Sequence, residues 1–348
     1  MAEETLVPGT EFAGDYRIER YVARGGMGEV YEATQLALDR RVALKLIAPR
    51  FGMDDSFRDR FRREARSAAA IDHTNILPVY DAGEDDGGRL YLATRFIDGP
   101  DLSSLLKEQG PLDVEQTISI LRQIGEALDA AHGRGLVHRD VKPANVMLER
   151  VSDGWHAYLT DFGLAKPANE KSEHTASGEV LGTVDYMAPE LINGVPADSR
   201  IDIYSFGCMI YRCLTGELPY RRDSTTATMI AHANAPIPLP SEAITGVPVP
   251  LDLVVQRAME KDPDKRARSA GALMRWAQGQ LDSSAVSVSQ VPGDAPTEET
   301  KLMSPATETE TVAAAPARKG PPFAVRVLIH LAAYAPLWAG AYLAGRLL

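Results

Sequence analysis

Cysteine is scarce in this sequence, because Cys208 and Cys213 are the only two among 348 residues. Two cysteines cannot form a disulfide framework, and their spacing matches no Cys-x-x-Cys metal motif. We therefore expect two reduced side chains buried among apolar neighbours. Such cysteine usage is consistent with a reducing cytosol.

Basic residues are in the minority, since 37 lysines and arginines stand against 48 aspartates and glutamates, giving a formal net charge of −11. A nonspecific nucleic-acid binder needs a basic face that displaces counterions from phosphates. We therefore expect no nucleic-acid partner. The N-terminus also lacks a basic stretch followed by an apolar run, so it is not predicted to be a secretory signal.

The first hundred residues show the alternation and the Val, Ile and Tyr content of strands, with one amphipathic helix among them. We expect this helix at Ser56–Ile71, with Asp55 or Ser56 as its cap. The expected strands are Tyr16–Val22, Gly28–Gln35, Arg41–Ile47, Leu77–Ala82 and Arg89–Phe96.

Beyond Gly99 the pattern changes to amphipathic helices. We expect them at Asp101–Gln109, Val114–Arg134, Asp202–Thr215, Pro250–Glu260 and Gly271–Leu281. A mostly antiparallel sheet lobe followed by a helical lobe is an α+β arrangement with a cleft between the lobes.

The composition divides the chain into four parts. We expect an N-terminal extension at 1–15, a folded two-lobed domain at 16–281, a disordered linker at 282–322 and an apolar C-terminal segment at 323–348. The linker is rich in Ser, Thr, Glu, Pro and Ala. It cannot bury enough apolar surface to offset the conformational entropy of the chain.

A glycine-rich hairpin, Ala23-Arg24-Gly25-Gly26-Met27-Gly28-Glu29-Val30, joins the first two strands. Glycines let a backbone approach phosphate oxygens closely. Downstream, Lys45 lies in a strand that we expect to be buried, where an unpaired lysine would lose its proton. Glu64, on the expected helix, is the candidate carboxylate partner. Each signal alone is weak, because many such hairpins are only turns and many such lysines only reach solvent.

Three further motifs follow in order: His138-Arg139-Asp140-Val141-Lys142-Pro143-Ala144-Asn145, then Asp161-Phe162-Gly163, then Ala188-Pro189-Glu190. With the glycine hairpin, the strand lysine and the helix glutamate, they match the signature set of protein kinases. From about Tyr16 to Gly279 the sequence therefore resembles the eukaryotic-like (Hanks-type) protein kinases. The resemblance implies the two-lobed protein kinase fold. The run Gly-Gly-Met-Gly-Glu-Val is typical of bacterial members.

The resemblance implies an ATP-dependent kinase that transfers the γ-phosphoryl group to serine or threonine hydroxyls of proteins, with Mg²⁺ or Mn²⁺. Asp140 would accept the proton of the attacking hydroxyl, and Lys142 would offset charge on the transferred group. Asn145 and Asp161 would hold the metal. A lysine at position 142 is typical of the serine/threonine class.

Lys45 would position the α- and β-phosphates, and Glu64 would position Lys45. Ala23 departs from the family pattern, which has glycine there, so its methyl group is expected to be tolerated with weaker ATP affinity. The ATP-binding residues that the resemblance implies are Val22, Ala23, Arg24, Gly25, Gly26, Met27, Gly28, Glu29, Val30, Ala43, Lys45, Thr94, Arg95 and Ile97.

Further expectations concern regulation and the helical lobe. Thr175 and Ser177 lie where bacterial relatives carry activating phosphosites. The resemblance therefore implies that two copies of the chain, as a homodimer, phosphorylate each other there. The added phosphates would order the segment that carries these two residues. Glu190 is expected to form a structural ion pair with Arg266. By the same resemblance, Asp202 caps backbone amides of the segment around Asp140.

The tail offers two hypotheses. The apolar run from Val327 to Gly345 is about long enough to span a bilayer. The preceding basic residues favour a single-pass cell-membrane protein with a cytoplasmic kinase domain. An interfacial or docking helix on a soluble cytoplasmic protein is the alternative. Threonines among acidic residues of the linker favour phosphothreonine sites for forkhead-associated-type readers. These are Thr300, Thr307, Thr309 and Thr311.

Two other classes of protein compete with an active protein kinase. A pseudokinase would be an ATP-binding scaffold without turnover, and it should lack an equivalent of Lys45, Asp140 or Asp161. A small-molecule kinase of the aminoglycoside phosphotransferase type should lack the Ala188-Pro189-Glu190 segment. All of these residues are present.

Overall fold

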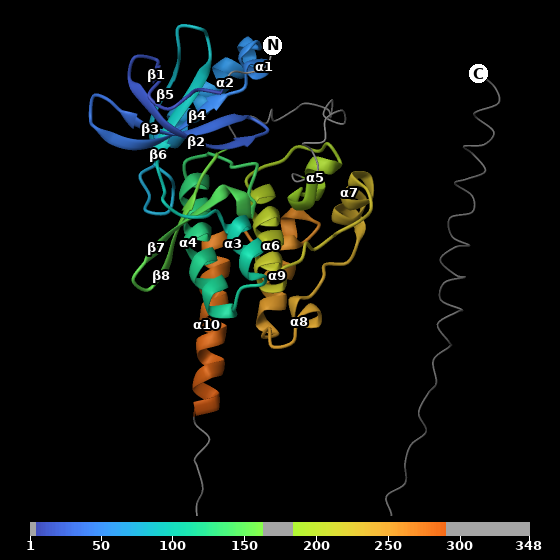
Figure 1. Ribbon diagram of the computed structural model, residues 1–348. Coiled ribbons are helices and arrows are strands. Elements are labelled where there is room, and N and C mark those ends of the chain that lie inside the picture. Colours follow the sequence, from blue (N-terminus) through green and yellow to red (C-terminus); the bar gives the residue numbers. More distant parts are fainter. Residues whose placement is uncertain (1–4, 163–183, 290–348) are drawn as a thin grey trace, which may run out of the picture. The chain divides into compact units, whose positions relative to one another are not determined.

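A computed structural model describes residues 5–162 and 184–289 of the chain, and the first part of it is a six-stranded antiparallel sheet (Figure 1). The strand order is β1-β2-β3-β4-β6-β5. The strands are β1 (Glu11–Phe12), β2 (Tyr16–Gly25), β3 (Gly28–Gln35), β4 (Arg40–Ile47), β5 (Val79–Glu84) and β6 (Leu90–Arg95).

One face of the sheet is covered by α2 (Asp55–Ala69), which follows the short helix α1 (Pro49–Gly52). Phe57 and Phe61 of α2 pack with Leu90 and Leu92 of β6 in one buried cluster. The Asp54 carboxylate accepts a hydrogen bond from the backbone of Ser56. The cap is therefore Asp54, one residue before the predicted candidates, because the helix starts earlier than its apolar pattern.

The other face of the sheet is covered by residues that precede Tyr16. Phe12 is buried against Tyr91, with ring centroids 5.6 Å apart, and Leu6 packs on the same cluster. The pair β1–β2 adds an edge strand to the sheet. The segment predicted as an extension at 1–15 therefore belongs to the sheet lobe from Leu6 onward.

The second part of the chain is helical and is built around α4 and α6 (Figure 1). The α-helices are α3 (Leu102–Gln109), α4 (Val114–His132), α5 (Pro189–Ile192), α6 (Arg200–Thr215), α7 (Thr225–Asn234), α8 (Pro240–Ala243), α9 (Pro250–Met259) and α10 (Ala270–Ser289). The remaining elements are the strands β7 (Val146–Val151) and β8 (Gly154–Leu159) and the 3-10 turns η1 (Pro143–Asn145), η4 (Val184–Tyr186) and η5 (Pro263–Lys265).

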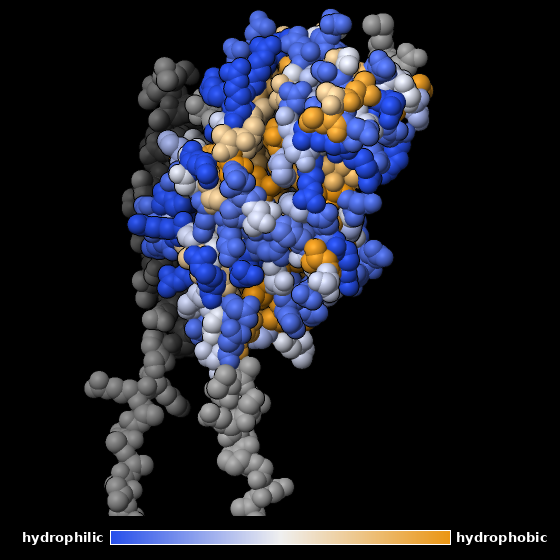
Figure 2. Space-filling view, turned by 90° about the vertical axis from the view of Figure 1, so that its left-hand side faces the viewer, coloured by the Kyte–Doolittle hydropathy of each residue, from blue (hydrophilic) through white to orange (hydrophobic). Residues whose placement is uncertain are grey.

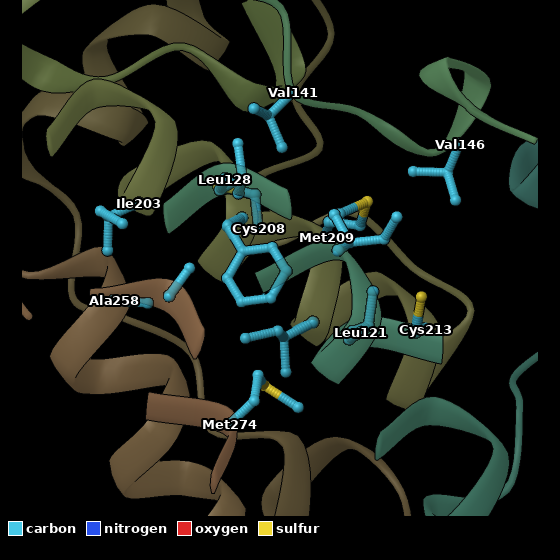
Figure 3. Close-up of a cluster of buried hydrophobic side chains, with 14 of the residues drawn as sticks. Leu121, Leu128, Val141, Val146, Ile203, Cys208, Met209, Cys213, Ala258 and Met274 are labelled. Carbon is cyan, nitrogen blue, oxygen red and sulfur yellow. The ribbon is translucent and has the colours of Figure 1, made fainter. Parts of the chain in front are cut away.

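The helical lobe has one large apolar core, in which side chains of α4, α6, α9 and α10 meet (Figure 3). Cys208 and Cys213 are both free, buried thiols, as the sequence predicts. Burial raises the pKa of the Cys213 thiol to about 12, so this side chain is an apolar filler. Val141 and Val146 flank the segment that carries Lys142 to Asn145 and lie in the same core.

The last helix is longer than predicted. α10 continues to Ser289, into residues 282–289 that the composition assigns to the linker. The first proline after the helix start is Pro292, so no strong helix breaker lies within the extension. Of the described residues, none lies in a helix long and apolar enough to cross a membrane. The predicted apolar segment at 323–348 lies outside the described residues.

The molecular face in Figure 2 is mostly hydrophilic, with hydrophobic residues in small separate patches. Single exposed apolar side chains are ordinary on a soluble domain.

Candidate active site

A cavity of about 420 Å³ lies between the sheet lobe and the helical lobe. Strands β2, β3, β4 and β6 line it on one side, and η1, β7 and residues 160–162 line it on the other. The predicted site residues that line the cavity are Val22, Ala23, Val30, Ala43, Lys45, Thr94, Arg95, Ile97 and Asp161. A cavity of this size with apolar walls and a few charged groups is typical of a small-ligand site.

Several apolar residues of the cavity wall lie outside the sequence motifs and were not predicted. Leu77 and Val79 line the cavity from the start of β5, and Met147 lines it from β7. Met147 stands between Val146 and Leu148, which are both fully buried in the helical core. Strand alternation after Asn145 could therefore have predicted that Met147 faces the cavity.

The connection between the lobes is held by the side chain of Arg95. Its guanidinium donates to both oxygens of Glu149, at 3.0 Å, and to the Tyr158 hydroxyl at 2.8 Å. Its backbone N–H donates to the carbonyl of Pro78 at 3.1 Å. Arg95 lines the cavity, as its place among the predicted ATP-binding residues requires, and its side chain also joins the two lobes.

Lys45 and Glu64 do not contact each other in this structure. The Lys45 ammonium lies 2.8 Å from the Asp161 carboxylate, and Glu64 lies 3.3 Å from the Arg139 guanidinium. Burial raises the pKa of Glu64 above its ordinary value, and the positive charge of Arg139 opposes the rise. The predicted Lys45–Glu64 pair is thus replaced by two other pairs, because Lys45 and Glu64 each have a second oppositely charged partner within reach.

The segment around Asp140 forms a compact cluster of charges and amides. The Lys142 ammonium lies 2.7 Å from the Asp140 carboxylate. The Asn145 side-chain amide donates to the same carboxylate at 2.9 Å and to the Asp140 carbonyl at 2.7 Å. Together these contacts fix the predicted proton acceptor beside a cation.

This cluster is joined to the strand end that carries Asp161. The N–H of Thr160 donates to the Asn145 carbonyl at 3.0 Å, and His138 Nε2 lies 2.8 Å from the Thr160 carbonyl. The His138 ring also packs on the Phe162 ring, with centroids 4.8 Å apart. Residues 138–145 and 160–162 therefore form one hydrogen-bonded unit, of which Ala144 and residues 160–162 line the cavity, whereas Asp140, Lys142 and Asn145 lie outside its wall.

Asp202 holds the segment around Asp140 from below. Its buried carboxylate accepts from the backbone N–H of His138 at 2.7 Å and from that of Arg139 at 2.8 Å. Arg139 has φ +63°, which is unusual for a residue with a side chain. The carboxylate stabilises this strained turn, as the resemblance to kinases implies.

Glu190 and Arg266 form the expected ion pair. Two parallel contacts of 2.7 and 3.1 Å join the guanidinium to the carboxylate, and the side chains are 0% and 4% exposed for Arg266 and Glu190. Arg266 also donates to the carbonyls of Glu260 and Arg200. The pair ties α5 to the segment before α10.

Most of the glycine hairpin does not line the cavity. Residues Arg24, Gly25, Gly26, Met27, Gly28 and Glu29 lie outside its wall. A Cβ atom on Gly28, whose φ is +147°, would meet the Leu46 carbonyl oxygen at 1.9 Å, so glycine is required there by packing. Glu29 is fully buried rather than turned towards a ligand.

The predicted phosphosites Thr175 and Ser177 lie outside the described residues.

The residues present suit a magnesium nucleotide. Among the described residues, no cluster of three or more His, Cys, Asp and Glu side chains could cage a metal ion. Mg²⁺ does not need such a cage, because it is commonly held by one or two protein oxygens together with waters and substrate phosphates. Two protein groups fit this donor set: the Asp161 carboxylate and the side-chain oxygen of Asn145. The amide nitrogen of Asn145 donates to Asp140, so its oxygen is the atom that would bind the metal.

Over residues 16–275 the chain matches the family described as "Protein kinase domain". The serine/threonine-protein kinase PknE of Mycobacterium bovis is 45% identical over 273 residues, which cover 78% of this chain and 47% of PknE. PknH of Mycobacterium tuberculosis is 43% identical over 260 residues, or 75% of this chain and 41% of PknH.

The crystal structure of the M. tuberculosis PknI kinase domain superposes with a TM-score of 0.65 at 32% identity. The superposition covers 80% of this chain and 100% of that domain. The chain spans less than half the length of PknE and PknH. It belongs to the bacterial Hanks-type serine/threonine branch of the protein kinase family.

Proposed function

We propose that this chain is an ATP- and magnesium-dependent serine/threonine protein kinase, with residues 16–281 as its catalytic domain. One observation supports the proposal: Lys45 and Asp161 line one cavity, and the Asp140–Asn145 cluster is hydrogen-bonded to the strand end that carries Asp161. A pseudokinase would be expected to have lost at least one of these charged groups.

In this proposal, MgATP supplies the phosphoryl group and the metal charge that neutralises it. Asp140 accepts the proton of the serine or threonine hydroxyl and aligns it for attack. Lys142, 2.7 Å from Asp140 in this structure, offsets negative charge where the phosphoryl group is transferred. Asn145 and Asp161 are the proposed metal ligands.

Activation requires an exchange of ion pairs at the cavity. Lys45 leaves Asp161 and pairs with Glu64, which must itself leave Arg139. Arg139 then becomes available to a phosphate on the segment that contains Thr175 and Ser177. We propose that autophosphorylation there, between two copies of the chain, drives this exchange. A Thr175→Ala, Ser177→Ala double variant with an unchanged initial rate would refute this step.

The activity is tested by transfer of ³²P from labelled ATP to myelin basic protein or to the chain itself. We expect magnesium-dependent label on serine and threonine after acid hydrolysis, and none with Asp140→Asn. ATP binding without any transfer would favour the pseudokinase. Label on an aminoglycoside and not on protein would favour a small-molecule kinase.

Two finer proposals rest on sequence alone. Residues 323–348 anchor the chain in the cell membrane with a cytoplasmic kinase domain, and a truncation at residue 290 should move the protein to the soluble fraction. Phosphothreonines in the linker recruit forkhead-associated-type readers. Phosphopeptide mapping that found residues 290–322 unmodified in active enzyme would refute the second proposal.

A further inference from the structure

Glu29 is a buried carboxylate at the base of the glycine hairpin. It lies in β3 directly opposite Arg24 of β2, one rung before the Gly25–Gly28 pair that closes the turn. Its side chain is 0% exposed, whereas Arg24 is 54% exposed. A fully buried carboxylate is rare in proteins unless it is paired, so its partners indicate its role.

Three donors converge on Glu29. Arg24 donates to one oxygen at 2.6 Å, and Tyr31 and Arg89 donate to the other at 2.7 and 3.3 Å. Burial by itself would raise the pKa of Glu29, but the hydrogen bonds from Tyr31, Arg24 and Arg89 outweigh it and hold the pKa below its ordinary value. The group is therefore a charged carboxylate with both oxygens satisfied.

Glu29 acts from behind the hairpin. The next rung towards the cavity pairs Ala23 with Val30, and both of these side chains line the cavity. Because successive side chains of a strand point to opposite faces, Glu29 and Tyr31 face away from Val30 and from the cavity. Glu29 cannot reach a nucleotide bound there.

The network also reaches the N-terminal segment. The Tyr31 hydroxyl, which donates to Glu29, accepts the backbone N–H of Leu6 at 3.1 Å. The Tyr31 ring packs edge-on against Tyr21, with centroids 5.6 Å apart. A continuous path of hydrogen bonds thus runs from residue 6 through Tyr31 and Glu29 to Arg24.

A glycine-rich turn has more conformational freedom than other turns, so a fixed rung beside it restricts the shapes that it samples. We propose that Glu29 is a positioning residue, which holds the hairpin in the form that binds nucleotide phosphates. This inference rests on the proposed ATP-dependent activity. The resemblance implied that Glu29 binds ATP, whereas in this proposal Glu29 supports the glycine hairpin.

The test compares the dissociation constants of MgATP and adenosine for the full chain, because adenosine has no phosphates. Glu29→Gln keeps the size of the side chain and removes its charge. We expect it to weaken MgATP binding about tenfold, the lower end of the range for a lost charged hydrogen bond, and to leave adenosine binding unchanged. Tyr31→Phe, which keeps the charge and removes one donor, should give a smaller effect in the same direction.

Glu19→Gln is the matched control. Glu19 lies on the neighbouring strand β2 and binds Arg17 and Thr34, and none of these three residues lines the cavity. It should change neither ligand's affinity. If Glu29 acts through Arg24, Glu29→Gln should weaken MgATP binding much less when Arg24→Gln is already present.

The outcomes are distinct. Equal weakening of MgATP and adenosine by Glu29→Gln, or no weakening of either, would overturn the positioning role. An undiminished effect of Glu29→Gln in the Arg24→Gln background would also overturn it. A wild-type chain that binds adenosine but not MgATP would instead overturn the proposed function.

Discussion

Arg266 offers a quantitative test of how the helical lobe is held together. Arg266→Met keeps most of the apolar stem but removes four hydrogen bonds, two to Glu190 and one each to the carbonyls of Glu260 and Arg200. Breaking a buried ion pair by removing one partner costs about 3–5 kcal/mol, because the other charge stays buried and unpaired. Each carbonyl that loses its donor adds about 1 kcal/mol. We therefore expect a loss of about 5–7 kcal/mol.

The assay is urea unfolding followed by tryptophan fluorescence, with thermal melting as a check. At roughly 2–4 °C per kcal/mol for a domain of this size, the melting temperature should fall by about 10–28 °C. Adding Glu190→Gln removes the stranded charge, so the double variant should lose less than the sum of the two single losses. Additive losses, or a loss below about 1 kcal/mol for Arg266→Met, would refute the reasoning.

Three further predictions concern the cavity, acid stability and the thiols. Lys45→Met should abolish phosphate transfer and the rise in melting temperature caused by MgATP, measured by thermal shift. Burial, together with the charge of Lys261, lowers the pKa of His232 from 6.5 to about 4. The unfolded chain therefore binds a proton between pH 6.5 and pH 4 that the folded chain does not, so about 3 kcal/mol of stability is lost as the pH falls through this window. Urea unfolding of His232→Gln should lack that loss. Cys208 and Cys213 should resist a maleimide reagent until the protein unfolds, and fast labelling of the native protein would contradict their burial.

The sequence predicted the regular parts of the fold well where one face is apolar. The bounds of β3, Gly28–Gln35, were predicted correctly, and α4 begins at the predicted Val114. The N-terminal edge strand was missed because β1 is only two residues long and Phe12 is its single buried side chain. The β7–β8 hairpin was missed although Val146 and Leu148 show the alternation of a strand.

The residues of the site could be predicted from the sequence where they belong to one of the ordered motifs. Lys45 and Asp161 at the cavity follow from the motifs, and the partner of Glu190 follows from the resemblance to kinases. The partner of Lys45 does not, because Glu64 and Asp161 are both candidates and the choice depends on the conformation of the domain. The role of Glu29 was also out of reach, since its burial depends on Arg89 and Tyr31 packing behind the turn.

The central claim is that Asp140 and Asp161 act on the terminal phosphate of one bound nucleotide. The most direct measurement is the intact mass of the chain after incubation with MgATP, together with the affinity for MgATP. We expect phosphate additions for the wild type, none for Asp140→Asn despite near-normal MgATP affinity, and none for Asp161→Asn, which should also bind MgATP more weakly. Phosphate additions to Asp140→Asn at the wild-type rate would contradict it.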